Sequence, residues 1–214
     1  TDLPNIQRKI MHSCAKWGKR SIVATHLLES MIQNPTPTRA EVTDVANAVY
    51  EGADAIMLSG ETSIGKYPVE CVKYLKSISK RTEKFQTLEY EKELITNSDW
   101  ESIAVAARDL SESIKADGII AVTRTGSTAG YISNAKPKDI PIYTFTNNIN
   151  TLNQLSLVGS VIPFYLKRLN NHKKTLEHLK DVLKPLHRKK KLKFVMVSGI
   201  FSEKHSEAIQ IINF

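Results

Sequence analysis

The amino-acid sequence predicts an α/β fold built around parallel strands. Stretches with apolar residues at helical spacing alternate along the chain with short, continuous apolar runs, a pattern typical of helices packed on a parallel sheet. Of the 214 residues, 41% are apolar and 24% are charged, so the chain can bury a core and is not of the collagen-like, disordered or disulfide-scaffold class. No apolar run approaches the roughly 18–20 residues that a membrane-spanning helix needs.

The cysteines and the first residues bear on the cellular compartment of the chain and on whether it is part of a longer protein. Cys14 and Cys71 belong to no spacing pattern, which favours a reducing cytoplasm over a secreted disulfide framework. The chain opens with TDLP, which has neither a Met nor a signal pattern, so we expect it to be a segment of a longer protein.

The first half predicts two successive strand–helix repeats. Gly18 and Gly52 each follow a stretch with helical periodicity and are expected to end helices, and Pro68 suits the first turn of a helix. In chain order we expect a helix over 3–17, a strand over 21–25, a helix over about 41–50, a strand over 55–58 and a helix from about 68. Residues 84–97 are polar and lack periodicity, so we expect a domain boundary there.

The second half predicts one compact sheet flanked by helices. It begins with the capping box Ser98-x-x-Glu101 ahead of a helix with an apolar face. The last two strands are joined by a short polar link, so we expect them to pair antiparallel in a five-stranded mixed sheet. After a helix ended by Gly118, we expect strands over 119–123, 141–146, 161–166, 193–197 and 208–214, and helices near 129–134, 151–157 and 167–193.

Three motifs in the first half resemble those of one enzyme family. They read THLLESM over 25–31, NPTPTRAEVTD over 34–44 and GADAIMLSGET over 52–62. Their length, order and spacing are similar to those of pyruvate kinase, and the resemblance continues more loosely through the second half. It implies the last βα units of a TIM-type (β/α)8 barrel over residues 1–86. The family's three-layer α/β domain, which serves regulation and assembly, would then follow over residues 97–214.

The resemblance also implies an activity and its requirements. Pyruvate kinases transfer a phosphoryl group from phosphoenolpyruvate to ADP, giving pyruvate and ATP in glycolysis, with Mg²⁺ and K⁺. The family works in the cytoplasm as a homotetramer. Its metal-binding carboxylates and catalytic lysine belong to upstream barrel strands, so we expect no metal site in this chain. We also expect no activity from the chain alone, because two βα repeats cannot close an eight-stranded barrel.

Three residues that follow predicted strands are candidates for the catalytic face. Thr25 and Ser59 come after successive strands, where barrel enzymes place their chemistry. By resemblance, Thr25 contacts the phosphoenolpyruvate or pyruvate end, near the proton given to the enolate. Ser59 and Glu61 match residues that organise water and proton delivery. The alternative is that Thr25 and Ser59 only cap the turns that follow them.

Arg39 and His26 flank these candidates. Arg39 resembles the family arginine that reaches across a subunit interface toward the neighbouring active site, and the alternative is an exposed arginine at a helix start. His26 stands where the family usually has Gln or Asn. Two interpretations follow: this histidine contributes to interface or substrate contacts, or, as is more common for a lone histidine, it serves packing.

The turn over 123–128 is a candidate phosphate site. A predicted strand runs into a helix start there, and its hydroxyl and backbone N–H groups can hold an anion. By resemblance this turn binds the phosphate of an allosteric sugar phosphate, and the alternative is an ordinary helix cap. Its residues are Thr123, Arg124, Thr125, Gly126, Ser127 and Thr128. The segment over 199–206 is charged and bulky where members that respond to fructose 1,6-bisphosphate carry glycines, which leaves the effector open.

A strongly basic segment extends over 167–193. It carries eleven Lys and Arg against two acidic residues, and it accounts for the net charge of +8. No aromatic residues interleave with its lysines, so we do not expect a nucleic acid partner. A leucine stripe predicts a helix with one packed face and one solvated basic face, formed by Leu176, Leu179, Leu183 and Leu186. The rival function is a stand-alone anion-binding module without catalysis, which would use this segment and the turn over 123–128.

Overall fold

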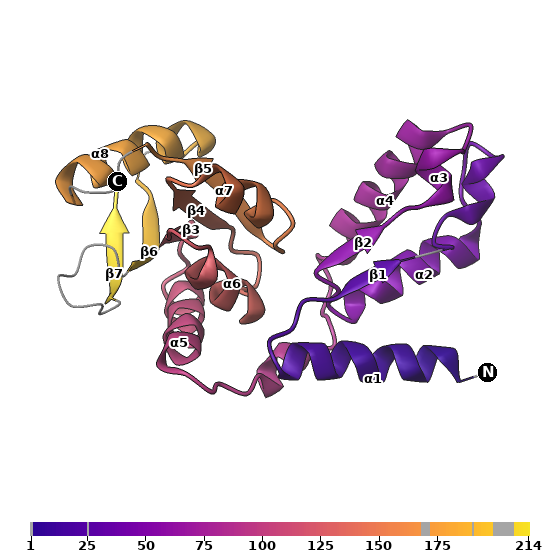
Figure 1. The fold of residues 1–214 in the computed structure, drawn as a ribbon, viewed down its shortest axis with the longest axis horizontal. Helices are drawn as coiled ribbons and strands as arrows, with labels where there is room; N and C mark the ends of the chain where they lie inside the picture. The colour runs from indigo at the N-terminus through magenta and orange to yellow at the C-terminus, as the bar shows by residue number, and fades with distance from the viewer. Residues whose placement is uncertain (1, 25, 168–171, 190, 199–207) are drawn as a thin grey trace. The chain divides into compact units, whose positions relative to one another are not determined.

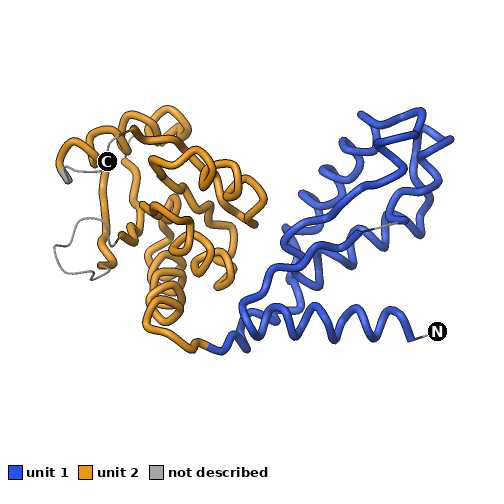
Figure 2. The backbone as a smooth tube through the Cα atoms, viewed as in Figure 1, with its two compact units in different colours: residues 1–95 blue, residues 96–214 orange. Residues whose placement is uncertain are grey.

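Figure 1 shows the fold in a computed structural model, which describes residues 2–24, 26–167, 172–189, 191–198 and 208–214. The chain divides into two compact units, residues 1–95 and residues 96–214, which Figure 2 distinguishes by colour. Each unit has its own buried apolar core.

The first unit contains two strand–helix repeats that follow an N-terminal helix. Its two strands lie parallel, and Ile22 pairs with Ala55 where they begin. Its elements are α1 (Leu3–Lys16), β1 (Ile22–Ala24), the 3₁₀ helix η1 (Glu29–Ile32), α2 (Arg39–Tyr50), β2 (Ala55–Met57), α3 (Gly60–Ser63), α4 (Pro68–Thr82) and the 3₁₀ helix η2 (Tyr90–Glu93).

Helix α2 begins two residues earlier than the apolar periodicity predicts. Thr38 is its N-cap, with extended backbone, and the Thr38 hydroxyl accepts the N–H of Glu41 at 3.3 Å. In return, Oε2 of Glu41 accepts the N–H of Thr38 at 2.7 Å. This reciprocal capping box satisfies N–H groups that a helix start leaves without partners, and it fixes where α2 begins.

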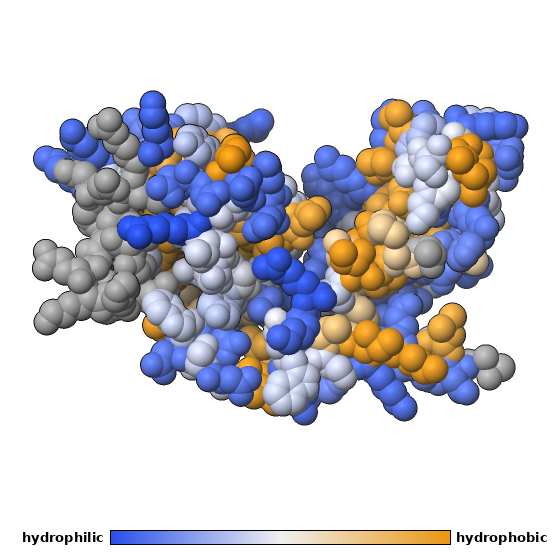
Figure 3. All heavy atoms as spheres, viewed as in Figure 1, coloured by the Kyte–Doolittle hydropathy of each residue, from blue (hydrophilic) through white to orange (hydrophobic). Residues whose placement is uncertain are grey.

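The core of the first unit lies between the strands and the helices α2 and α4. Leu28, Met31 and Val45 are fully buried there. The strands also carry exposed apolar side chains, because Ile22 is 66% and Met57 46% exposed. Apolar surface is exposed along α1 as well (Figure 3). Two short parallel strands therefore leave much of their apolar surface uncovered within the unit.

The second unit is a five-stranded sheet in the order β5-β4-β3-β6-β7. The first four strands lie parallel and β7 pairs antiparallel with β6, as the sequence predicts. The elements of this unit are α5 (Asp99–Ser113), β3 (Gly118–Val122), α6 (Ser127–Asn134), β4 (Ile142–Thr146), α7 (Ile149–Leu155), β5 (Val161–Tyr165), α8 (His172–Leu183), the 3₁₀ helix η3 (Lys184–Leu186), β6 (Lys193–Ser198) and β7 (Ala208–Asn213).

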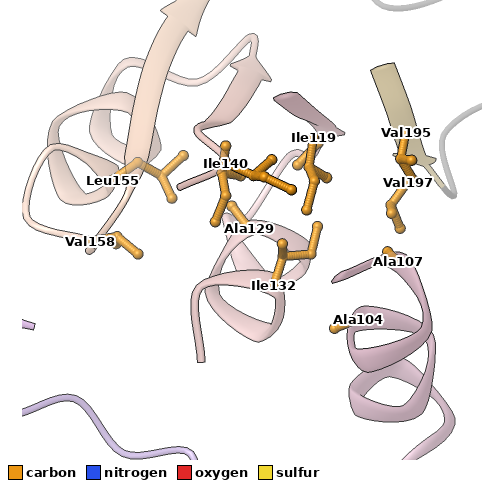
Figure 4. Packing of buried hydrophobic residues seen from close by; sticks show 12 residues of the cluster. Ala104, Ala107, Ile119, Ala129, Ile132, Ile140, Leu155, Val158, Val195 and Val197 are labelled. Carbon is orange, nitrogen blue, oxygen red and sulfur yellow. The ribbon is translucent and has the colours of Figure 1, made fainter. Parts of the chain in front are cut away.

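Both faces of this sheet are covered by helices, which makes three layers. Successive residues of β3 point to opposite faces, so Ile119 belongs to one core cluster and Ile120 to the other. Helices α5, α6 and α7 pack on the Ile119 side (Figure 4). On the opposite side, α8 contributes the fully buried Leu179 and Leu183. All five residues of β3 are buried, as expected for a central strand covered on both faces.

The basic segment does not form one long helix. α8 ends at Leu183 and is followed by a single 3₁₀ turn. Pro185 explains this end, since it has no N–H to donate and its ring clashes with the preceding turn of an α-helix. The prediction that Leu186 lies on the packed stripe is therefore wrong, because its side chain is 54% exposed.

Candidate functional site

The first candidate site lies at the carboxyl ends of β1 and β2. Ala24 and Met57 are the last paired residues of the two parallel strands, so the segments that follow β1 and β2 leave the sheet at the same edge. Thr25 comes directly after β1 but lies outside the described residues. Ser59 follows β2 and is the N-cap residue of α3. The side chain of Ser59 makes no capping hydrogen bond, so the alternative of a purely capping hydroxyl does not fit this residue.

Glu61 links the two segments that follow the strands. The residue is 2% exposed, and its carboxylate accepts the N–H of Leu28 at 3.1 Å and the N–H of Ser59 at 2.8 Å. Burial by itself raises the pKa of Glu61. The backbone N–H groups that donate to the carboxylate lower that pKa by more, so the pKa lies below its ordinary value. Glu61 is thus an ionised group that holds the backbone at Leu28 with one oxygen and at Ser59 with the other. Its expected part in proton delivery stays a prediction.

A second buried carboxylate, Glu41, was missed by the sequence analysis as a site residue. It is 9% exposed, and in addition to its bonds to Thr38 it accepts two hydrogen bonds from Ser30. The Ser30 N–H donates to Oε1 at 2.7 Å, and the Ser30 hydroxyl donates to Oε2 at 2.6 Å. Burial raises the pKa of Glu41, but hydrogen bonds from Ser30 and Thr38 lower it to below its usual value. The Thr38-x-x-Glu41 spacing indicates the cap, whereas nothing in the sequence indicates the contact with Ser30.

Arg39 and His26 both lie on the surface of this unit. Arg39 is exposed as the first residue of α2, which is compatible with both of its interpretations. The prediction that His26 serves packing is wrong. Its side chain is 74% exposed, and its Nδ1 lies 2.8 Å from a carboxylate oxygen of Glu29. The backbone of His26 adopts a φ of 52°, which is uncommon for a residue other than glycine.

The second candidate site is the turn between β3 and α6. Its six predicted residues divide evenly, with three exposed side chains and three buried residues. The buried Thr123 hydroxyl accepts the N–H of Gly126 at 3.0 Å, which closes the turn. Gly126 has a φ of 88°, and a Cβ there would lie 3.3 Å from the Thr151 side chain, so glycine suits this position. The remaining buried residue is Thr128.

The exposed part of this turn presents hydroxyl groups at a helix start. The Thr125 and Ser127 hydroxyls lie 2.9 Å apart, and Arg124 is exposed beside them. Gly126, the N-cap of α6, has no side chain with which to cap the helix. The first N–H groups of an α-helix attract anions, so this end of the sheet can hold a phosphate group between exposed hydroxyls and a guanidinium.

The basic segment combines a structural contact with a solvated face. Lys189 Nζ donates to Asp117 Oδ1 at 2.5 Å, and the N–H of Lys193 donates to Asp117 Oδ2 at 2.9 Å. Burial raises the pKa of Asp117, but these two hydrogen bonds lower it to below its usual value. On α8 the lysines, such as Lys173 and Lys180, are exposed while the central leucines pack, as the leucine stripe predicts.

In the part of the chain that the structure describes, no three His, Cys, Asp or Glu residues gather closely enough to hold a metal ion. None of the described helices has the length and apolar character needed to cross a bilayer.

Comparison with known proteins assigns the family. The family model described as "Pyruvate kinase, barrel domain" matches residues 1–72, and the model described as "Pyruvate kinase, alpha/beta domain" matches residues 101–212. The chain belongs to the pyruvate kinase family. The predicted resemblance and the predicted fold class, a barrel end followed by an α/β domain with a five-stranded mixed sheet, are therefore both confirmed.

Individual pyruvate kinases match most of this chain. The enzyme of Thermotoga maritima is 42% identical over 180 residues, which are 82% of this chain and 38% of the relative. That of Chlamydia trachomatis is 38% identical over 169 residues, 76% of this chain and 35% of the relative. The crystal structure of a pyruvate kinase from Cryptosporidium parvum superposes with a TM-score of 0.89 at 27% identity, covering 99% of this chain and 44% of that one. The chain thus spans less than half the length of these pyruvate kinases.

Proposed function

We propose that this chain acts as the C-terminal part of a pyruvate kinase, which transfers a phosphoryl group from phosphoenolpyruvate to ADP. One observation carries the proposal, namely that models of the family's barrel and α/β domains match successive segments of the same chain. The motif residues Ser59 and Glu61 also lie at the strand ends where a barrel places its chemistry.

In this proposal the residues of the first unit act on the pyruvate end of the substrate. The bond between phosphorus and the enol oxygen breaks as a new bond forms to ADP, and the enolate carbon then takes up a proton to give pyruvate. Thr25 and Ser59 carry hydroxyls that can both donate and accept a proton along that path. Ionised Glu61 holds the Ser59 backbone in place. Mg²⁺ and K⁺ would offset charge on the phosphoryl group and would bind residues outside this chain.

The chain alone is expected to be inactive. β1 and β2 pair only with each other among the described strands, and Ile22 and Met57 leave apolar surface uncovered. In a complete pyruvate kinase, the remaining barrel strands and helices would cover that surface and would bring the metal-binding residues.

Turnover measurements test this proposal. ADP phosphorylation that depends on phosphoenolpyruvate should be measurable for the complete polypeptide that carries residues 1–214, and absent for residues 1–214 alone. A complete polypeptide without this turnover would contradict the proposed function.

The second unit would supply regulation and assembly. We propose that Arg124, Thr125 and Ser127 bind a phosphate of a sugar-phosphate effector, since they are the exposed members of the turn before α6. The complete enzyme would assemble as a cytoplasmic homotetramer, and Arg39 would face a neighbouring subunit. The stand-alone anion-binding module remains the rival function, favoured by the exposed lysines of α8. Salt-dependent binding of oligonucleotides would support the rival, whereas stabilisation by phosphosugars alone would support an effector site.

A further inference from the structure

Glu41 makes more contacts than the start of a helix requires. As the third residue of α2 it needs only Thr38 to complete a capping box. Yet the same carboxylate accepts two further hydrogen bonds from Ser30, eleven positions earlier in the chain. Four donors thus converge on one buried carboxylate, and two of them come from η1 rather than from the helix that Glu41 caps.

These bonds close the loop between η1 and α2. Ser30 lies in η1, just before that loop, and donates to both oxygens of Glu41, whereas Thr38 lies at the end of the loop and donates to Oε2 alone. These four distances are 2.6–2.9 Å. Hydrogen bonds to an ionised acceptor are roughly twice as strong as those between neutral groups. The loop therefore cannot shift at either end without breaking bonds to a buried charge, which is costly.

Glu61 adds a contact just before Ser30. It accepts the N–H of Leu28, two positions before Ser30, and joins it to Ser59 at the end of β2. The chain from Leu28 to Thr38 is thus fixed by two buried carboxylates, one from each strand–helix repeat. Thr25 lies three positions before Leu28, and Arg39 directly follows Thr38. Both are residues that the proposed function uses.

We infer that Glu41 is a positioning residue of the active site, which keeps the segment from Leu28 to Thr38 in the arrangement that catalysis needs. The inference rests on the proposed function. Glu41 itself contacts neither substrate nor metal in this account, and it acts through Ser30 and Thr38. Misplacing a positioning segment by about 1 Å can cost up to about 100-fold in rate, so the effect should appear in kcat.

Glu41→Gln tests this role in the complete enzyme. The substitution keeps the size of the side chain but replaces one accepting oxygen with an NH₂ group that cannot accept an N–H. We expect kcat per folded active site to fall by about tenfold or more, with the KM for ADP within about twofold of the parent. If Glu41 served only to stabilise the fold, the substitution would lower Tm and leave kcat of the folded enzyme at the parent value.

The chain offers a matched control in Glu101, the third residue of α5. Its Oε2 accepts the N–H of Asn97 at 2.6 Å, and its own N–H donates to the Ser98 hydroxyl at 3.3 Å, so its contacts are local. Glu101→Gln makes the same chemical change at the same helix position in the other unit. It should lower Tm without changing kcat. Equal kcat values for the parent, Glu41→Gln and Glu101→Gln would overturn the inference.

Ser30 provides a second test that leaves the capping box intact. Ser30→Ala removes one donor to Glu41, whereas Ser30→Thr keeps the hydroxyl. The inference predicts that kcat falls in Ser30→Ala and returns to near the parent value in Ser30→Thr. If Glu41→Gln does not fold, this pair decides, and an unchanged kcat in Ser30→Ala would contradict the positioning role. A parent enzyme without turnover would contradict the proposed function, and normal parent turnover with unchanged variants would contradict only the inference.

Discussion

Glu41 and Glu61 are buried carboxylates, and the hydrogen-bond donors that surround them are backbone N–H groups and hydroxyls. A buried charge is tolerated when such donors satisfy its oxygens, and the donors then hold the charged form in place. Both side chains thus serve as fixed acceptors around which the strand ends of the first unit are arranged.

Acid should destabilise the protein through these two residues. Their pKa values in the folded state lie below the ordinary value of 4.5. Their contribution to the free energy of unfolding is therefore complete above about pH 4.5. It is lost as the pH falls through the lower pKa values of the folded protein. Between about pH 5 and about pH 3, the midpoint of urea unfolding should therefore decrease more for the parent than for the Glu41→Gln/Glu61→Gln double variant. Identical pH dependence in the two proteins would contradict this.

The exposed hydroxyls of the turn before α6 can be tested by direct binding. Thr125→Ala/Ser127→Ala removes two exposed hydrogen-bonding groups of the proposed phosphate site. We expect this double variant to need at least about fivefold more fructose 1,6-bisphosphate, used as a probe, for the same thermal stabilisation, because each of the two lost hydrogen bonds costs about 0.5–1.5 kcal/mol. Ser102→Ala, an exposed hydroxyl on α5, is the control and should not change the response. A parent-like response of the double variant would remove these residues from the site.

At the scale of elements, α8 shows how one residue limits a helical pattern. The leucine spacing continues through Leu186, but Pro185 ends regular helix geometry just before it. Leu183 is fully buried and Leu186 is 54% exposed, although the two have the same side chain and lie three positions apart.

Truncation of these two leucines should have unequal effects. Leu183→Ala leaves a cavity in the core and should lower the free energy of unfolding by about 2–5 kcal/mol. Leu186→Ala removes an exposed side chain and should change it by less than about 0.5 kcal/mol. Urea unfolding of the two variants measures the difference. Equal losses would mean that Leu186 packs against the protein after all.

Most elements could be predicted from the sequence because they depend on local patterns. Apolar runs such as 119–123 indicated the strands, and Pro68 indicated where α4 begins. The prediction that Gly118 ends a helix is wrong, because α5 already ends at Ser113 and Gly118 is the first residue of β3. The exposed position of His26 was not predictable, since the sequence shows neither its φ of 52° nor its contact with Glu29. The contact between Ser30 and Glu41 was not predictable either, because it joins two segments whose approach is set by the fold.

For the site residues too, the sequence indicated which residues matter but not the contacts that they make. Motif resemblance brought Ser59 and Glu61 forward, and the structure places Glu61 against the Ser59 backbone. The resemblance gave no way to see that both oxygens of Glu61 accept main-chain N–H groups, because that depends on where Leu28 lies in the fold. In the turn over 123–128, sequence alone could not separate the exposed Thr125 and Ser127 from the buried Thr123.

At the scale of the whole molecule, the two units differ in how well their sheets are covered. The second unit covers both faces of its central strand with helices, whereas the first exposes Ile22 and Met57 on strands that pair only with each other among the described residues. A two-stranded parallel sheet buries little apolar surface, so the first unit is suited to pack against further barrel strands. This agrees with a chain that spans 38% of the Thermotoga maritima pyruvate kinase.

The size of the natural polypeptide tests the central claim most directly. Intact mass measurement, with an immunoblot of source cells using an antibody against residues 1–214, gives that size. The account predicts a product of at least about twice 24.0 kDa, large enough to hold a complete barrel. A product of 24.0 kDa would contradict the claim that this chain works as part of a complete pyruvate kinase, and would favour the anion-binding module.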